Sequence, residues 1–130
     1  MSENLFDLTG RVALVTGASR GLGQYFARAL ARAGAALVVT SRNLDRLHAF
    51  EKEIQALGRR VLALELDVTD HDSIQHGIAA AEREFGHIDV LVNNAGCNVR
   101  KPALDVTWND WNVVVDTSAA SSWRRRWRAA

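Results

Sequence analysis

Residues 12–23 read Val-Ala-Leu-Val-Thr-Gly-Ala-Ser-Arg-Gly-Leu-Gly, and this stretch decides the fold. Its apolar, valine-rich start is typical of a buried strand, and a helical pattern over 21–33 follows the glycines. A strand, a glycine turn and a helix in this order present main-chain N–H groups and a helix N-terminus to a phosphate. Side chains in place of Gly17, Gly21 and Gly23 would keep a diphosphate away from the backbone. The turn therefore predicts phosphate binding, and the alternative is an ordinary strand-to-helix turn.

The rest of the chain alternates between strand-like and helix-like segments. Apolar runs at 36–40, 61–66 and 89–93 predict strands, and helical patterns cover 44–57, a segment ending at Phe85, and 107–115. This alternation with short loops predicts an α/β fold with a doubly wound parallel sheet. In such sheets a ligand lies beyond the carboxyl ends of the strands.

Composition limits the class of protein. The 130 residues are 48% hydrophobic and 24% charged, and no run approaches the ~18 apolar residues of a membrane span. Four of the 16 basic residues lie between positions 124 and 128, and without them 12 basic residues stand against 15 acidic ones. A single cysteine, Cys97, excludes an internal disulfide, and the start of the chain has no signal-peptide layout. We expect a cytoplasmic protein that binds neither nucleic acid nor membrane, without a histidine metal site.

Two further motifs follow later strands. The glycine turn has the spacing T-G-x-x-x-G-x-G, the pair Asp67-Val68 follows the third strand, and N-N-A-G stands at 93–96 after the fourth. In this order they resemble the classical short-chain dehydrogenase/reductase family, over residues 5 to 117. The lead-in at 5–10 looks like gluconate 5-dehydrogenase-type and 3-oxoacyl-carrier-protein-reductase-type members. The resemblance implies the amino-terminal part of a truncated Rossmann-type doubly wound parallel sheet with strand order 3-2-1-4.

The resemblance also implies a function and a set of cofactor contacts. Members of the family exchange hydride between a nicotinamide dinucleotide and an alcohol/carbonyl pair. The contacts carried over by motif are Gly17, Ser19, Arg20, Gly21, Leu22, Gly23, Arg42, Asp67, Val68, Asn94, Ala95 and Gly96. Asp67 and Val68 would meet the adenine and Asn94 the ribose, while Asn93 would tie neighbouring strands. The alternatives are that Asp67 caps the next helix and that both asparagines only form a turn.

The end of the second strand bears on the choice of cofactor. An NAD site places a carboxylate there to hold the ribose 2′-OH, whereas this chain reads Thr40-Ser41-Arg42. Arg42, together with Ser19 and Arg20 of the glycine turn, suits a 2′-phosphate, because guanidinium groups bind phosphate oxygens in pairs. We therefore expect NADP rather than NAD. The alternative is that both arginines are solvated surface charges.

The catalytic groups of the family have no counterpart in the sequence. The family uses a tyrosine with a lysine four residues later, which keeps the phenol near its working pKa, and a serine that orients the carbonyl. Tyr25 is the single tyrosine, and residue 29 is alanine. We predict no catalytic residue here and no turnover from this chain, and the alternative function is a non-catalytic dinucleotide-binding fragment. The resemblance implies homo-oligomeric full-length relatives that act on a small alcohol or ketone.

The tail departs from the family pattern. Residues 118–130 carry two tryptophans and four arginines, and with GC-rich codons of our choosing a shifted frame of this tail spells an amphipathic helix start. We predict a cofactor-binding region over 1–117 followed by a frameshifted tail. The alternative is a Trp/Arg patch for nucleic acid or membranes. Trp108 and Trp111, at helical spacing, are expected to be packing residues, and Cys97 a bystander.

Overall fold

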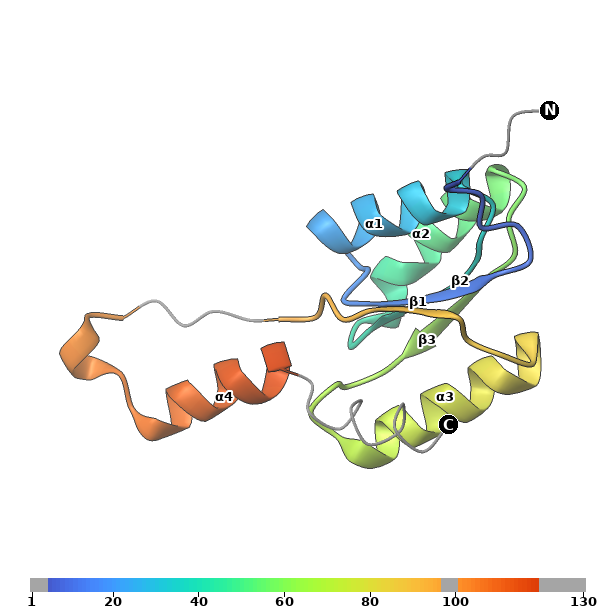
Figure 1. Cartoon of the computed structure of the whole chain (residues 1–130). Helices are drawn as coiled ribbons and strands as arrows, with labels where there is room; N and C mark the ends of the chain where they lie inside the picture. Colours follow the sequence, from blue (N-terminus) through green and yellow to red (C-terminus); the bar gives the residue numbers. More distant parts are fainter. Residues whose placement is uncertain (1–4, 97–100, 120–130) are drawn as a thin grey trace.

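The computed structural model describes residues 5–96 and 101–119 of the chain. Figure 1 shows a sheet with helices on both of its faces and a last helix standing to one side. The elements run in the order β1 (Val12–Thr16), α1 (Gly21–Arg32), β2 (Ala36–Ser41), α2 (Leu44–Ala56), β3 (Val61–Glu65), α3 (His71–Phe85), β4 (Val90–Val92), the 3-10 helix η1 (Ala103–Asp105) and α4 (Trp108–Ala119).

The four strands form one parallel sheet in the order β3-β2-β1-β4, which confirms the predicted order. In β1 and β2 the register pairs Leu14 with Val38 and Thr16 with Thr40. The central strand β1 is buried along its whole length. A strand covered on both faces needs apolar residues at successive positions, and this explains the unbroken apolar runs of the sequence.

Two hydrophobic clusters hold the helices on the sheet. Helices α1 and α2 cover one face, and α3 covers the other (Figure 1). On the first face the small side chains of Ala27 and Ala31 are fully buried, so α1 lies close to the strands. On the second face Ile74, Ile78 and Ala81 of α3 pack on the sheet. The helical stripes predicted from the sequence are the buried faces of these helices.

Several predicted boundaries differ from the observed ones by one residue, and three differences lie near β4 and α4. Strand β4 stops at Val92, one residue early, because the Asn94 amide N–H donates to the Val92 carbonyl oxygen at 3.0 Å and turns the chain. A 3-10 turn, η1, lies in the segment predicted as a loop. Helix α4 begins one residue later than predicted and extends to Ala119 instead of Val115.

The prediction that Trp108 and Trp111 are packing residues is wrong for the described part of the chain. Their side chains are 80% and 59% exposed. The reason is that α4 stands to one side of the sheet (Figure 1), and between Trp108 and Val115 only Asp110 and Val114 are half-buried. None of the described helices is long and apolar enough to cross a bilayer.

Candidate functional site

A cleft of about 560 Å³ opens at the carboxyl ends of the strands. It gathers residues from the segments after β1, β2, β3 and β4, which the parallel topology brings to one edge of the sheet. Of the predicted contacts, eleven line it: Gly17, Ser19, Arg20, Gly21, Leu22, Arg42, Asp67, Val68, Asn94, Ala95 and Gly96. Sequence motifs that lie far apart in the chain therefore converge on one cleft. Thr16 and Ala95, for example, are 79 positions apart and are joined by a hydrogen bond.

Gly23 is the predicted contact that does not line the cleft. A Cβ atom at this position would overlap the Gly17 carbonyl oxygen and lie 2.8 Å from the Asn94 side-chain nitrogen. At Gly17, where φ is +67°, a Cβ would meet the Ala95 Cα atom at 2.9 Å. Gly17 thus permits a tight crossing with the segment after β4, and Gly23 lets α1 pack directly on the turn.

The first turn of α1 faces the cleft with unfilled donors. Its N-cap residue, Arg20, makes no side-chain hydrogen bond to the helix, and no acidic side chain lies in the first turn. The N–H groups at a helix start have no partner within the helix, and the helix dipole favours negative charge there. Since Gly21 and Leu22 of this turn line the cleft, the turn can bind an anion with its main chain.

A hydrogen-bond network ties the segment after β4 to the glycine turn. The Thr16 hydroxyl accepts from the main-chain N–H groups of Asn94 at 3.0 Å and Ala95 at 2.9 Å. The Asn94 side-chain amide donates to the carbonyl oxygens of Thr16 and Gly17, both at 3.2 Å. The tie that was predicted for Asn93 is therefore made by Asn94, and Asn93 is exposed. The motif fixes the backbone of the turn through its second asparagine.

The interpretation of Asp67 as a helix cap is wrong. The cap of α3 is Asp70, whose side chain accepts from the N–H groups of Asp72 and Ser73. One carboxylate oxygen of Asp67 accepts from the Thr69 hydroxyl at 2.7 Å and the Thr69 N–H at 2.9 Å. These bonds, with a smaller effect of the Arg42 charge, hold the pKa of Asp67 below its ordinary value of 3.8. Asp67 is therefore a fixed anionic acceptor at the edge of the cleft.

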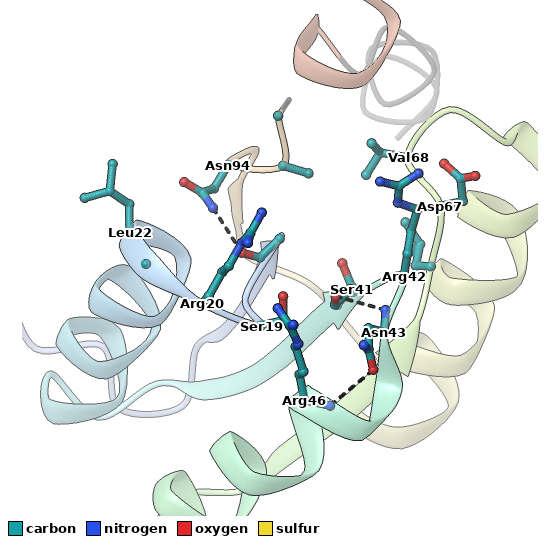
Figure 2. A pocket seen from close by; sticks show the side chains of 16 residues that line it. Ser19, Arg20, Leu22, Ser41, Arg42, Asn43, Arg46, Asp67, Val68 and Asn94 are labelled. Atoms are coloured by element: carbon teal, nitrogen blue, oxygen red, sulfur yellow. Dashed lines mark hydrogen bonds between the residues drawn. The ribbon is translucent and has the colours of Figure 1, made fainter. Parts of the chain in front are cut away.

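Three arginines surround the cleft: Arg20, Arg42 and Arg46 (Figure 2). Within the described ranges none of them forms an ion pair with a carboxylate. Arg20, Arg42 and the segment Thr40-Ser41 were predicted at this site from the sequence, whereas Arg46, Asn43 and Leu66 of the lining were not. A signal for Arg46 was present, because a helix that begins directly after β2 must begin at the edge of the sheet where the cleft lies.

One buried hydroxyl in this lining has no partner. Thr40 at the end of β2 is 1% exposed, and its Oγ1 atom makes no hydrogen bond in the described part of the chain. An unsatisfied buried polar atom costs about 1–3 kcal/mol, so the cleft offers a polar position that a ligand or water would satisfy. The glycine cradle, the free helix amides, the guanidinium groups and this hydroxyl together fit a phosphorylated nucleotide.

Other predicted residues lie away from this cleft. Tyr25 is 68% exposed on α1 and does not line it. Among residues 5–96 and 101–119, no group of histidine, cysteine and carboxylate side chains is placed to hold a metal ion. Cys97 and the tail from 120 onward lie outside the described residues.

Comparison with known proteins identifies the family. The family model of the short chain dehydrogenases matches residues 11–124, and the chain belongs to this family. It is 43% identical over 115 residues to gluconate 5-dehydrogenase of Gluconobacter oxydans, covering 88% of this chain and 45% of that enzyme. It is 42% identical over 121 residues to 2-dehydro-3-deoxy-D-gluconate 5-dehydrogenase of Escherichia coli, covering 93% and 47%. The chain spans about half the length of these curated relatives.

Solved structures share the fold. A short-chain type dehydrogenase/reductase from Mycobacterium marinum superposes with a TM-score of 0.88 at 35% identity, covering 93% of this chain and 48% of that one. An alcohol dehydrogenase from Thermococcus sibiricus, complexed with 5-hydroxy-NADP, gives a TM-score of 0.81 at 36% identity over 88% and 49%. A metagenomic short-chain oxidoreductase in complex with NADP gives 0.78 at 37% identity over 85% and 50%. These confirm the Rossmann-type sheet.

Proposed function

We propose that this chain binds a nicotinamide dinucleotide in the cleft, and NADP in preference to NAD. The observation that carries the proposal is the placement of the open first turn of α1 across the cleft from Arg42 and Arg46. Main-chain donors suit the diphosphate, which both cofactors share. Guanidinium groups suit the additional phosphate, which NADP alone carries.

Different residues of the cleft would contact different parts of the cofactor. The N–H groups of the glycine turn, from Ser19 to Leu22, would hold the diphosphate, with Gly17 keeping the backbone close. Asp67 and Val68 would contact the adenine ring, and Asn94, Ala95 and Gly96 would lie along the nicotinamide ribose. The Asn94 amide nitrogen is engaged by Thr16 and Gly17, so its oxygen is the atom available to a ribose hydroxyl. When bound, the nicotinamide supplies hydride donation and acceptance.

The preference for NADP depends on charge at the end of β2. A carboxylate there would repel a 2′-phosphate, whereas the residues at this place are Ser41, Arg42 and Asn43. The proteins from Thermococcus sibiricus and from the metagenome were solved with NADP-type ligands, which supports the assignment. Binding of NADH that equals or exceeds binding of NADPH would overturn it.

For the whole protein to which this chain corresponds we propose NAD(P)-dependent oxidoreduction of an alcohol/carbonyl pair. The sequence holds neither a tyrosine with a lysine four positions later nor a substitute, so we propose that the chain alone binds cofactor without turnover. A small alcohol or ketone as substrate, a homo-oligomer and a cytoplasmic location complete the proposal. We also keep the division into a cofactor-binding region over 1–117 and a frameshifted tail from 118 as a proposal that sequencing of the gene tests.

The test is calorimetric titration of the purified chain with NADPH and NADH, followed by an assay with alcohols and ketones. We expect binding of NADPH, weaker binding of NADH and no reduction or oxidation of any substrate. Absence of binding to both cofactors contradicts the proposal. Turnover of any substrate contradicts the statement that the chain alone is catalytically inactive. Salt-sensitive binding to nucleic acid that disappears on deletion of 118–130 would favour the Trp/Arg patch instead.

A further inference from the structure

The sheet has two edges, and the edge at β3 is protected. The Arg60 carbonyl accepts from the Leu37 N–H of β2, so by the alternation of peptide groups along a strand Ala63 faces away from β2. The outward N–H of Ala63 donates to a Glu51 carboxylate oxygen of α2 at 3.1 Å. The exposed, charged Glu65 ends the strand. An occupied N–H and a charge both hinder pairing with another strand, so this edge is protected.

The edge at β4 lacks this protection in the part of the chain that the structure describes. The Asp89 N–H donates to the Val12 carbonyl oxygen at 2.8 Å, so alternate residues of this segment face β1. The N–H and carbonyl groups of Val90 and the N–H of Val92 consequently face away from β1, on the side where the sheet ends. Strand β4 is only half-buried, whereas β1 is buried along its whole length. Unpaired main-chain groups next to half-buried apolar side chains are a template for a further strand.

One flank of α1 extends this apolar edge. The side chains of Val90 and Val92 pack against the cluster that α1 covers. Arg28 donates to Glu53 at 2.9 Å and so turns toward α2, which lies beside α1 (Figure 1). Phe26 precedes Arg28 by two residues, about 200° around the helix axis, and thus lies on the flank away from α2. It is 41% exposed. Val90, Val92 and Phe26 together are called the open edge below.

The charges around the open edge favour a second copy of this chain as the partner. The segment 90–96 carries no charge, and the formal net charge of the chain is only +1, so repulsion between copies is weak. The charged residues lie before the strand, where Asp89 pairs with Arg11 and His87. Two-fold symmetry makes identical edges antiparallel, so this charged end of one copy lies beside the uncharged residues 93–96 of the other. No like charges meet in this arrangement.

We infer that two copies of this chain associate through the open edge, with β4 antiparallel to β4 of the second copy. The two four-stranded sheets then form one continuous sheet, and Phe26 of each copy covers the pairing. Because β4 has three residues, the contact is smaller than the ~800 Å² per partner of a standard interface, and the dimer dissociates in the micromolar range. The inference is independent of the proposed function, since Phe26, Val90 and Val92 do not line the cleft.

The first test is sedimentation velocity of the purified chain from about 5 to 500 μM, compared with Val90→Pro. Proline removes the outward N–H and places a ring at the pairing surface, while the ladder to β1 does not use this N–H. We expect a monomer–dimer equilibrium in the unsubstituted chain and a dissociation constant at least about tenfold higher in V90P, the effect of losing one or two hydrogen bonds and their packing.

A second variant and a direct readout keep the test independent of how well V90P folds. Phe26→Gln removes the apolar flank, and its matched control is Leu57→Gln, a side chain of similar exposure, 44%, at the end of α2. We expect F26Q to weaken the dimer at least about threefold and L57Q to leave it unchanged. Amide hydrogen exchange at Val90 and Val92 should slow as the concentration rises. Circular dichroism and the thermal midpoint verify that each variant is folded.

Three results would overturn the inference. A chain that stays monomeric at the highest concentration does not pair with itself, and the open edge is then left to a strand of a different polypeptide. A dimer that neither V90P nor F26Q weakens, with exchange at Val90 independent of concentration, has its contact elsewhere. Species that grow beyond the dimer exclude the two-fold arrangement, because an isologous pair uses up both edges.

Discussion

The side-chain amide of Asn94 donates a hydrogen bond to the carbonyl oxygen of Gly17 at 3.2 Å, joining residues 77 positions apart. The ladder between β1 and β4 ends at the pair of Val15 and Val92. The Asn94 side chain therefore continues the connection beyond the ladder and into the glycine turn. The shape of the turn thus depends on a residue that follows the last strand.

Replacement of Asn94 by alanine should destabilise the fold and weaken NADPH binding. The variant leaves the carbonyl oxygens of Thr16 and Gly17 without this donor, at a cost of about 1–3 kcal/mol. Urea denaturation measures the change in the free energy of unfolding. The matched control is Asn93→Ala, because Asn93 is exposed, and it should stay within about 0.5 kcal/mol. Equal losses in the two variants would show that the turn does not depend on this side chain.

Much of the fold was predictable because local signals agreed with each other. The apolar runs specify buried parallel strands, and the apolar stripes of α1, α2 and α3 specify which face of each helix packs. The end of β4 was not predictable from propensity, because it is set by the hydrogen bond from the Asn94 N–H to Val92. The packing expected of Trp108 also failed, since periodicity shows that a helix has an apolar stripe but not whether anything covers it.

The residues of the site that belong to a sequence motif were predictable, and those outside a motif were not. The predicted contacts of the glycine turn other than Gly23, and the pair Asp67-Val68, line the cleft as expected, because topology fixes the edge to which every β-to-α segment goes. The tie to the glycine turn was assigned to Asn93 and is made by Asn94, since the sequence does not show which of two adjacent residues in a turn points toward the sheet. Arg46 was missed because no motif includes it, although its helix begins directly after β2, at the edge of the sheet where the cleft lies.

Gly23→Ala should abolish binding of NADPH. The added methyl group overlaps the Gly17 carbonyl oxygen and approaches the Asn94 nitrogen, so α1 must move away from the turn. Overpacking of this kind costs about 1–3 kcal/mol. The control is Gly58→Ala, which has a φ of +80° and open space around it, and strain costs it about 1–2 kcal/mol. Both variants lose stability, but only G23A should lose binding in calorimetric titration. Unchanged affinity in G23A would contradict this close approach.

The ion pair between Arg28 and Glu53 should make stability depend on pH. Arg28 contacts both carboxylate oxygens of Glu53, at 2.5 and 2.9 Å, and so links α1 to α2. This bond holds the pKa of Glu53 below its ordinary 4.5. Because the folded pKa is the lower one, the stabilisation is complete above about pH 4.5 and is lost as the pH falls through the lowered value.

The difference in unfolding free energy between the unsubstituted chain and Glu53→Gln should thus be greatest near neutral pH, at about 0.2–1 kcal/mol, since both side chains are partly exposed. It should shrink as the pH falls through the lowered pKa of Glu53, as measured by urea denaturation across the pH range. Arg28→Lys retains the positive charge but loses the paired contact. The effect of Glu53→Gln on the free energy of unfolding should therefore be smaller in an Arg28→Lys background than in the unsubstituted chain. A difference that grows on acidification would reverse the sign argued here.

The start of α4 should melt independently of the sheet. The Thr107 N–H donates to an Asp110 carboxylate oxygen at 3.0 Å, and the Asp110 N–H donates to the Thr107 hydroxyl at 3.1 Å, which forms a capping box. Lys101 donates to the same carboxylate oxygen at 2.8 Å, and this bond is the largest cause of a pKa of about 2 for Asp110. A lowered pKa means that the box is complete above about pH 4 and opens as the pH falls toward 2.

The substitution Asp110→Asn should fray this helix start at neutral pH already, because the amide lacks the charge that holds Lys101. Since α4 stands apart from the sheet, the global unfolding midpoint should hardly change (Figure 1). Amide hydrogen exchange of residues 108–112 is therefore the measurement, and we expect faster exchange there in D110N than in the unsubstituted chain. Asp105→Asn, in η1 and outside the box, is the control and should leave these rates unchanged. Slow exchange in D110N at neutral pH would mean that the helix start is held by contacts other than this carboxylate.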